Sequence, residues 1–261
     1  MAHLPNSESE QSSKLSNSSA ESIAFSGLSF HFLTLFPELF LQVLQSSLLG
    51  KAQKRGLVSF SLIQLRDFAT DPHRTVDDTP YGGGEGMLLK ADVLYSAWKS
   101  IVDFSACERG KPKPLTVLLS PQGEIFSQKM AEELASYSGI IFICGHYEGV
   151  DQRFIDLCVD REVSIGDYVL TGGELPSLVL ADAITRLIPG VVGNSRSLTE
   201  ESLENGLLKY PQYTRPRIFK DLSVPEVLLK GDHSAIAEWR HAQRLERTIK
   251  KRPDLLKLRR F

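Results

Sequence analysis

The chain has 261 residues, of which 42% are hydrophobic and 24% charged, and its formal net charge is −2. This length and composition suit one large globular domain, or a domain with a smaller second one. No apolar run reaches the roughly 18–20 residues of a membrane-spanning helix, and no basic stretch followed by an apolar one marks a signal peptide. We therefore expect no membrane contact. The cysteines Cys107, Cys144 and Cys158 show no CxxC spacing, so we expect reduced thiols and a cytoplasmic location.

Strand and helix patterns alternate along the chain after a polar start. The first 28 residues are rich in serine and poor in large apolar side chains, so we expect a disordered extension there. The patterns then predict, in chain order, a strand at 30–36, a helix at 37–50, a strand at 58–65, a polar loop at 66–86, a helix at 91–102, a strand at 115–120, a helix at 127–138, a strand at 140–144, strand character at 167–171 and a helix at 173–190.

This alternation predicts an α/β fold built on a parallel sheet with right-handed crossovers. The run at 140–144 is apolar throughout, which is typical of a parallel strand covered on both faces. Three predicted strands end in glycine-containing loops, SPQG, GHYEG and TGG. Because ligands collect at the carboxyl ends of parallel strands, and glycine lets the backbone approach them, these loops predict a site for a flat ligand such as adenine. The alternative is that they are ordinary turns.

Other nucleotide and metal signatures do not occur in the sequence. The stretch GGGEGM at 82–87 does not fit GxGxxG, and no GxxxxGK[ST] loop is present, which disfavours a dinucleotide or ATP enzyme. No HExxH motif or paired His/Cys spacing indicates a catalytic metal. No nucleophile elbow indicates an acyl-transfer or hydrolytic enzyme.

Charge is unevenly distributed along the chain. Residues 206–261 carry 14 Lys/Arg against 6 Asp/Glu, whereas the remainder carries 16 against 26. A polar stretch at 193–205 precedes this basic segment, and the pattern at 226–256 is strongly helical. The basic segment predicts a small helical domain that binds a polyanion; the alternative is a solvated basic helix face.

Seven motifs follow one another through the chain: RTVDDTPYGGGEGM, LSPQG, CGHYEGVDQR, SIGDYVLTGGELP, IPGVVG, GLLKYPQYTRP and VPEVLLKGDH. Together, from about Phe30 to about Leu256, they resemble the bacterial tRNA (guanine-N1-)-methyltransferase family TrmD of the SPOUT superfamily. Their number, length and order make the resemblance very specific. It implies an enzyme that methylates N1 of guanosine 37, beside the anticodon, in tRNAs with a preceding guanosine.

The resemblance also implies a fold and a cofactor. The fold is a SPOUT-type α/β parallel sheet with a deep trefoil knot, a rare exception to the rule against knots, plus a small C-terminal α-helical domain. The implied divisions are a disordered extension (1–28), the methyltransferase domain (29–192), a flexible linker (193–205) and a basic tRNA-binding domain (206–261). In this family S-adenosylmethionine binds in the knot. The matching positions here are Ser120, Pro121, Gly145, Tyr147, Glu148, Gly149, Ser164, Ile165, Gly166, Asp167, Tyr168, Val169, Leu170, Gly172 and Gly173.

The methyl acceptor sets its own chemical requirements. N1 of guanine carries a proton, so a general base must remove it while a cation stabilises the charge that develops on O6. The resemblance places the base at Glu201, where the family has aspartate, with Glu200 as the neighbouring alternative. It places the cation at Arg186, whose alternative role is to complement the dipole of its helix. Glu148 would face the cationic end of the donor, or stabilise its own turn.

Further residues and partners follow from the same resemblance. Asp77 lies in the segment that reaches the target base and its 5′ neighbour, unless this segment is simply a turn-rich loop. His146 stands where relatives often carry arginine, and we assign it no role. The expected partners are the anticodon stem-loop of tRNA and a second copy of the chain, in a homodimer whose active site lies at the subunit interface. The family also implies Mg²⁺ during transfer, although the sequence shows no metal-binding cluster.

Two other functions stay open on the sequence alone. One is a SPOUT methyltransferase that acts on ribosomal RNA or on another tRNA atom, which GLLKYPQYTRP and the basic segment do not favour. The other is a non-catalytic RNA-binding protein, against which the intact glycine loops, Arg186 and an acidic linker residue argue.

Overall fold

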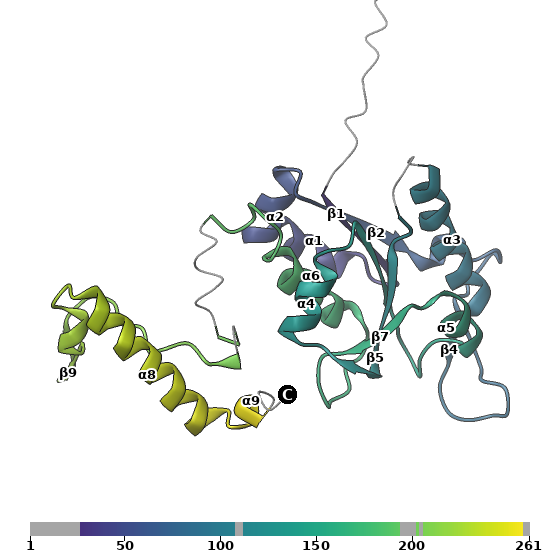
Figure 1. Ribbon diagram of the computed structural model, residues 1–261. Coiled ribbons are helices and arrows are strands. Elements are labelled where there is room, and N and C mark those ends of the chain that lie inside the picture. Colours follow the sequence, from purple (N-terminus) through teal and green to yellow (C-terminus); the bar gives the residue numbers. More distant parts are fainter. Residues whose placement is uncertain (1–26, 108–111, 194–201, 204–205, 258–261) are drawn as a thin grey trace, which may run out of the picture.

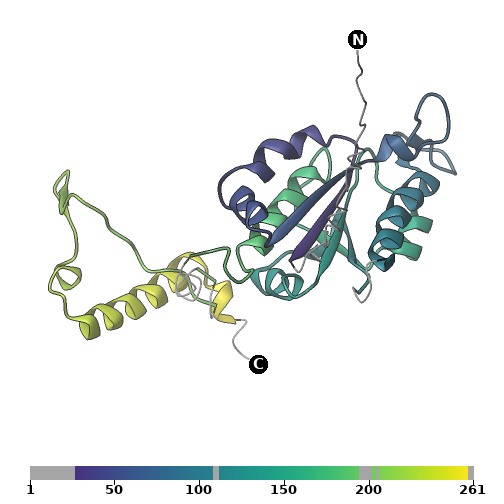
Figure 2. The same cartoon turned by 90° about the horizontal axis from the view of Figure 1, so that it is seen from above.

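The protein has an α/β part and a C-terminal part that contains one long helix (Figures 1 and 2). This computed structural model describes residues 27–107, 112–193, 202–203 and 206–257. In the α/β part, helices cover both faces of one sheet, giving three layers. Such an arrangement is required when strands are apolar on both sides, because each face must be removed from water.

Five strands form the central sheet, and all neighbouring strands in it are parallel. In the order in which they pair, they are β2 (Val58–Gln64), β1 (Leu28–Thr34), β6 (Gly139–Cys144), β5 (Leu115–Ile125) and β7 (Arg161–Ser164). The predicted α/β fold with a parallel sheet is therefore confirmed. Strand order gives the pairing but not the threading of the chain, so the knot stays a prediction.

Alternate positions of the strands fill two cores. On one face, the rings of Phe30, Phe32 and Phe142 pack with centroids 5.4–6.5 Å apart. Leu33 and Ile143, from the same two strands, belong to the core on the other face. The first core is covered by α1 (Glu38–Gln45), α2 (Ser47–Lys54), α4 (Gln128–Leu134) and α6 (Glu174–Thr185), and the second by α3 (Ala91–Cys107), α5 (Gln152–Cys158) and the 3-10 helix η1 (Leu65–Phe68).

The helix predicted at 37–50 is in fact two helices. Ser46 is extended and Ser47 has a φ of +46°, a conformation that interrupts the helical backbone. Gly50 does not end a helix, as predicted, but is buried within α2. A Cβ there would overlap the backbone of Gln45, so this glycine is required by the tight approach of α2 to the end of α1.

Several predictions about strands were also wrong, beginning with the first strand, which was expected at 30–36 and covers Leu28–Thr34. The strand expected to end at Ser120 continues to Ile125, with a register shift between Leu119 and Glu124. Residues 167–171, expected to have strand character, form no strand, and the strand before them, β7, ends at Ser164. The predicted loop at 66–86 contains one strand of a small antiparallel hairpin, formed by β3 (Asp77–Asp78) and β4 (Leu88–Leu89).

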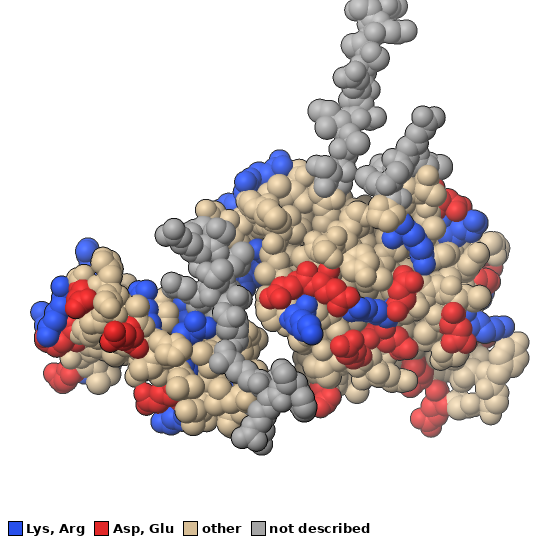
Figure 3. Space-filling view, in the orientation of Figure 1, with Lys and Arg blue, Asp and Glu red and all other residues tan. Residues whose placement is uncertain are grey.

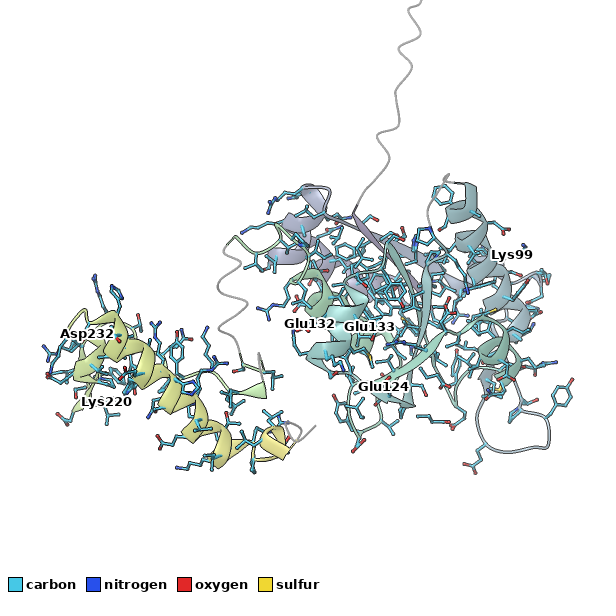
Figure 4. All side chains as sticks on the ribbon, in the orientation of Figure 1. Lys99, Glu124, Glu132, Glu133, Lys220 and Asp232 are labelled. Atoms are coloured by element: carbon cyan, nitrogen blue, oxygen red, sulfur yellow. The ribbon has the colours of Figure 1, made fainter. Side chains whose placement is uncertain are left out.

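The C-terminal part is built around α8 (His233–Lys251), which starts later than the predicted 226. Asp232 caps this helix by accepting hydrogen bonds from the backbone N–H groups of Ser234 and Ala235. Lys220 and Asp232 lie at the same end of this part (Figure 4). The other elements are β8 (Ile218–Phe219), β9 (Leu222–Ser223), the 3-10 helix η3 (Glu226–Leu228) and α9 (Asp254–Lys257). Among the described residues, no helix has the length and apolar character needed to cross a membrane.

Candidate functional site

Segments at the carboxyl ends of β5, β6 and β7 surround one cleft of about 340 Å³. Parallel pairing brings these ends to the same edge of the sheet, which is why segments distant in sequence meet there. Of the predicted pocket residues, Asp167 does not line the cleft and all the others do. The cleft also includes residues to which the sequence analysis gave no role, among them Gln122, Gln152, Ile155 and Glu162.

The loop after β6 forms one wall of the cleft and is joined to the β3–β4 hairpin. Tyr147 and Gly149 have φ angles of +58° and +130°, so the chain turns sharply here. The N–H of Leu89 donates to the carbonyl of Gly149 at 3.0 Å, and the N–H of Glu148 donates to the carbonyl of Met87 at 3.0 Å. The hairpin that carries Asp77 is therefore fixed against the cleft, although Asp77 itself does not line it.

The segment after β7 forms a second, more exposed wall. Gly166 has a φ of +150°, and its N–H is 3.2 Å from Oγ of Ser164, which accepts that hydrogen bond. The tight turn leaves Tyr168 and Val169 54% and 82% exposed. An apolar rim at the mouth of a cleft that also contains backbone polar groups can hold a flat, partly polar ligand.

Two glycines between this segment and α6 are explained by packing. A Cβ on Gly172 would overlap the imidazole of His146 and would lie 2.5 Å from Oε2 of Glu174. A Cβ on Gly173 would lie 2.7 Å from Cα of Cys144. These positions require glycine whatever the cleft binds. The sequence analysis explained these glycines by close approach to a ligand and did not foresee that packing against protein atoms also requires them.

Sequence reasoning missed a buried polar group next to these glycines. Glu174 is 2% exposed, and its carboxylate accepts a hydrogen bond from the Thr34 hydroxyl at 2.6 Å and lies 2.8 Å from Nε2 of His146. Burial, together with the charge of Glu174, raises the pKa of the Cys144 thiol well above its ordinary value. A glutamate directly after TGG, at the start of an apolar helix, was the available signal for this group.

Of the predicted catalytic residues, Arg186 lies in the described part of the chain and does not line the cleft. Arg186 follows the last residue of α6, and its N–H donates to the carbonyl of Asp182. Since Arg186 follows Gly173 by 13 residues across α6, the two lie about 20 Å apart along the helix axis. Glu201, and its alternative Glu200, lie outside the described residues.

We expect Gly173→Ala to lower the free energy of unfolding by about 1–3 kcal/mol, because its Cβ would press on backbone atoms that the sheet holds in place. Urea denaturation measures this change. Gly193→Ala is the control, since a Cβ at that position would meet nothing within 4 Å. Equal stability of the two variants would contradict the packing explanation.

Comparison with known proteins gives the family. The family model described as tRNA (Guanine-1)-methyltransferase TrmD matches residues 28–258. The tRNA (guanine-N(1)-)-methyltransferase of Pelotomaculum thermopropionicum is 52% identical over 225 residues, which are 86% of this chain and 88% of the relative. The enzymes of the same name from Carboxydothermus hydrogenoformans and Staphylococcus haemolyticus are 51% and 50% identical, over 87% and 86% of this chain and 87% and 89% of their own. The chain therefore belongs to the tRNA (guanine-1)-methyltransferase TrmD family.

Proposed function

We propose that the protein transfers a methyl group from S-adenosylmethionine to N1 of guanosine 37 in tRNAs that carry guanosine at position 36. The observation that carries this proposal is the cleft at the carboxyl ends of β5, β6 and β7, which the motifs of the family surround. Its relatives are named for methylation of tRNA at guanine N1. The names of the relatives do not give positions 36 and 37, which our proposal takes from the resemblance of the sequence motifs.

The cleft suits a donor of this kind. Its volume of about 340 Å³ falls within the roughly 300–1,000 Å³ of small-molecule pockets. A Cβ on Gly149 would meet nothing within 4 Å, so the backbone there is open to a ligand. Tyr168 and Val169 offer apolar surface to adenine, and Glu148 offers a carboxylate to the donor's ammonium group. When bound, S-adenosylmethionine supplies a methyl group on a sulfonium centre, which becomes a neutral thioether after transfer.

We assign proton removal and charge stabilisation to two residues of the chain. The carboxylate of Glu201 accepts the N1 proton of guanine, which leaves an electron pair on N1 for the new bond to the methyl carbon. The guanidinium of Arg186 stabilises the negative charge that this step places on O6. Glutamate in place of aspartate keeps the carboxylate and lengthens its reach by one methylene, so its position depends on the linker.

A second copy of the chain brings these residues to the cleft in our proposal. Within one chain Arg186 is about 20 Å from Gly173 along α6, too far to act in the same cleft. Leu175 and Val179 of α6 are 59% and 48% exposed and lie on the helix stripe that continues to Arg186. An exposed apolar stripe of this kind is typical of a surface that another subunit covers.

The C-terminal part is proposed to hold the anticodon stem-loop. Residues 206–261 have a strong excess of basic side chains, and the guanidinium of Arg240 lies 4.7 Å from the centre of the Tyr210 ring. In the α/β part, Glu124, Glu132 and Glu133 lie on one face, where Glu133 pairs with Arg161 (Figures 3 and 4). Since phosphates bind surfaces with an excess of basic side chains, we expect tRNA to contact the C-terminal part.

The proposal also covers where the enzyme is located and whether the protein itself binds a metal ion. Two buried, reduced cysteines, Cys144 and Cys158, support a cytoplasmic enzyme. The described residues contain no group of three or more His, Cys, Asp or Glu side chains that could hold a metal ion. They therefore provide no protein cage for the Mg²⁺ that the resemblance implies, and no step of the mechanism proposed here passes through a metal.

Purified protein should convert guanosine 37 of an unmodified tRNA transcript to 1-methylguanosine in the presence of S-adenosylmethionine, as measured by mass spectrometry of nucleosides. A transcript with another base at position 36 should react at least about ten-fold more slowly, because a site built to bind that guanosine loses its hydrogen bonds. Equal rates on both transcripts, or a methyl group on another atom, would contradict the assignment.

Glu201→Gln should slow methyl transfer in a single turnover by roughly 100-fold or more, since an amide cannot accept the N1 proton. The rate is measured with enzyme in excess over tRNA, so that product release does not enter. Glu200→Gln is the matched control and should react as the unaltered protein does. A near-normal rate for Glu201→Gln would remove this residue from the role of base.

Mixing two inactive variants tests whether Arg186 acts across the subunit interface. Arg186→Ala should be inactive for lack of the cation, and Gly145→Leu should be inactive because its side chain fills the cleft. After unfolding and refolding together, mixed dimers should recover part of the activity, because one cleft in each is intact and meets an intact Arg186. No recovery in a mixture shown to contain mixed dimers would place Arg186 in the cleft of its own chain.

A further inference from the structure

Two buried polar side chains, Thr34 and Glu174, and the partly buried His146 form a group that has no part in the mechanism above. Thr34 and Glu174 are 0% and 2% exposed, so their polar atoms are removed from water. One carboxylate oxygen of Glu174 accepts from the Thr34 hydroxyl, and the other faces Nε2 of His146. The Thr34 hydroxyl in turn accepts from the N–H of Phe36 at 2.9 Å. As a carboxylate, Glu174 can only accept, which requires the proton of His146 to be on Nε2.

This group joins three segments that are far apart in the sequence. Thr34 is the last residue of β1, His146 lies in the loop after β6, and Glu174 is the first residue of α6. His146 lines the cleft, whereas Thr34 does not. Two backbone contacts accompany the side-chain bonds: Gly172 and His146 form an antiparallel bridge, and the N–H of Gly173 donates to the carbonyl of Gly145 at 2.9 Å. The walls of the cleft formed by 145–149 and 164–173 therefore meet at the imidazole–carboxylate contact.

A buried carboxylate imposes a definite geometry on the groups around it. Its transfer from water is costly unless hydrogen bonds replace its hydration, so both of its partners must stay in place. The ring of His146 also packs on Phe36, with centroids 5.0 Å apart. His146 is thus fixed at two points, and its own backbone forms part of the cleft wall.

We propose that His146 is a positioning residue for methyl transfer: by donating a hydrogen bond to buried Glu174, it holds the 145–149 wall against the 172–173 turn and keeps the cleft in the shape that binds the methyl donor. This inference rests on the proposed function. Thr34 takes part by holding the other oxygen of the same carboxylate. The side chain of His146 acts through Glu174 and is not assigned to the reacting atoms.

The test compares His146→Phe, which keeps a ring next to Phe36 but has no N–H, with His146→Gln, which keeps an N–H donor. Binding of S-adenosylmethionine is measured by calorimetry, and KM for the donor and kcat by steady-state kinetics on tRNA. His146→Phe should weaken donor binding and raise the donor KM about ten-fold, the effect of one hydrogen bond to a charged group. Its kcat at saturating donor should change little, and His146→Gln should recover most of the lost affinity.

Two further variants distinguish positioning from a general loss of structure. Thr34→Val removes the other hydrogen bond of Glu174 without touching the cleft, so it should also raise the donor KM, and its effect should not add to that of His146→Phe. His73→Phe, at an exposed histidine that does not line the cleft, should behave as the unaltered protein does. A fall in kcat with an unchanged donor KM would show that fewer molecules are folded, and would overturn the positioning role.

The outcomes also separate this inference from the proposed function. If the unaltered protein binds the donor and His146→Phe binds it equally well, the positioning role is wrong while the function stands. If His146→Phe and His146→Gln lose affinity equally, an N–H donor at this position does not restore donor binding, which also overturns the inference. If His146→Phe does not fold, Thr34→Val provides the test, and an unchanged donor affinity in that variant would overturn the inference. An unaltered protein that binds no S-adenosylmethionine would overturn the proposed function and this inference with it.

Discussion

The parallel pairing of β5 with β6 and β7 is the constraint on which the candidate site depends. Leu118 of β5 pairs with Ile143 of β6 and with Glu162 of β7, so the three strands reach the same edge of the sheet nearly in step. Segments that are tens of residues apart in the sequence then surround one cleft. The helices on both faces contribute by covering apolar strands, which leaves the carboxyl edge as the place where backbone groups are open to a ligand.

Glycines around the cleft serve two different physical purposes. Gly149 has a φ of +130° and no neighbour within 4 Å of an added Cβ, so it opens the backbone to the cleft. Gly172 and Gly173 are closely packed, one against an imidazole and a carboxylate and the other against the backbone at the end of β6. The same residue type thus supplies access at one wall and dense packing at the next. Both are needed when a cleft is formed directly on the edge of a sheet.

The residues to which our proposal gives a role lie in different parts of the chain. The α/β part forms the cleft, whereas Arg186 lies at the far end of α6 and the basic side chains concentrate in the C-terminal part. A rigid helix cannot bring its two ends together, which is why our proposal places Arg186 of one copy of the chain at the cleft of a second copy. The exposed Leu175 and Val179, on the stripe that leads to Arg186, agree with that proposal.

Local sequence patterns determined the fold class, the cleft loops and the family, because apolar periodicity and long glycine motifs depend on near neighbours along the chain. The break at Ser47, the extension of β5 to Ile125 and the irregular course of 167–171 depended on tertiary packing, which overrides local preference. The same holds for the hydrogen bonds of Glu174, since its partners lie 140 and 28 residues away. The sequence showed a glutamate at the start of a helix; only the folded chain shows that this carboxylate is buried and joins β1 to the wall of the cleft.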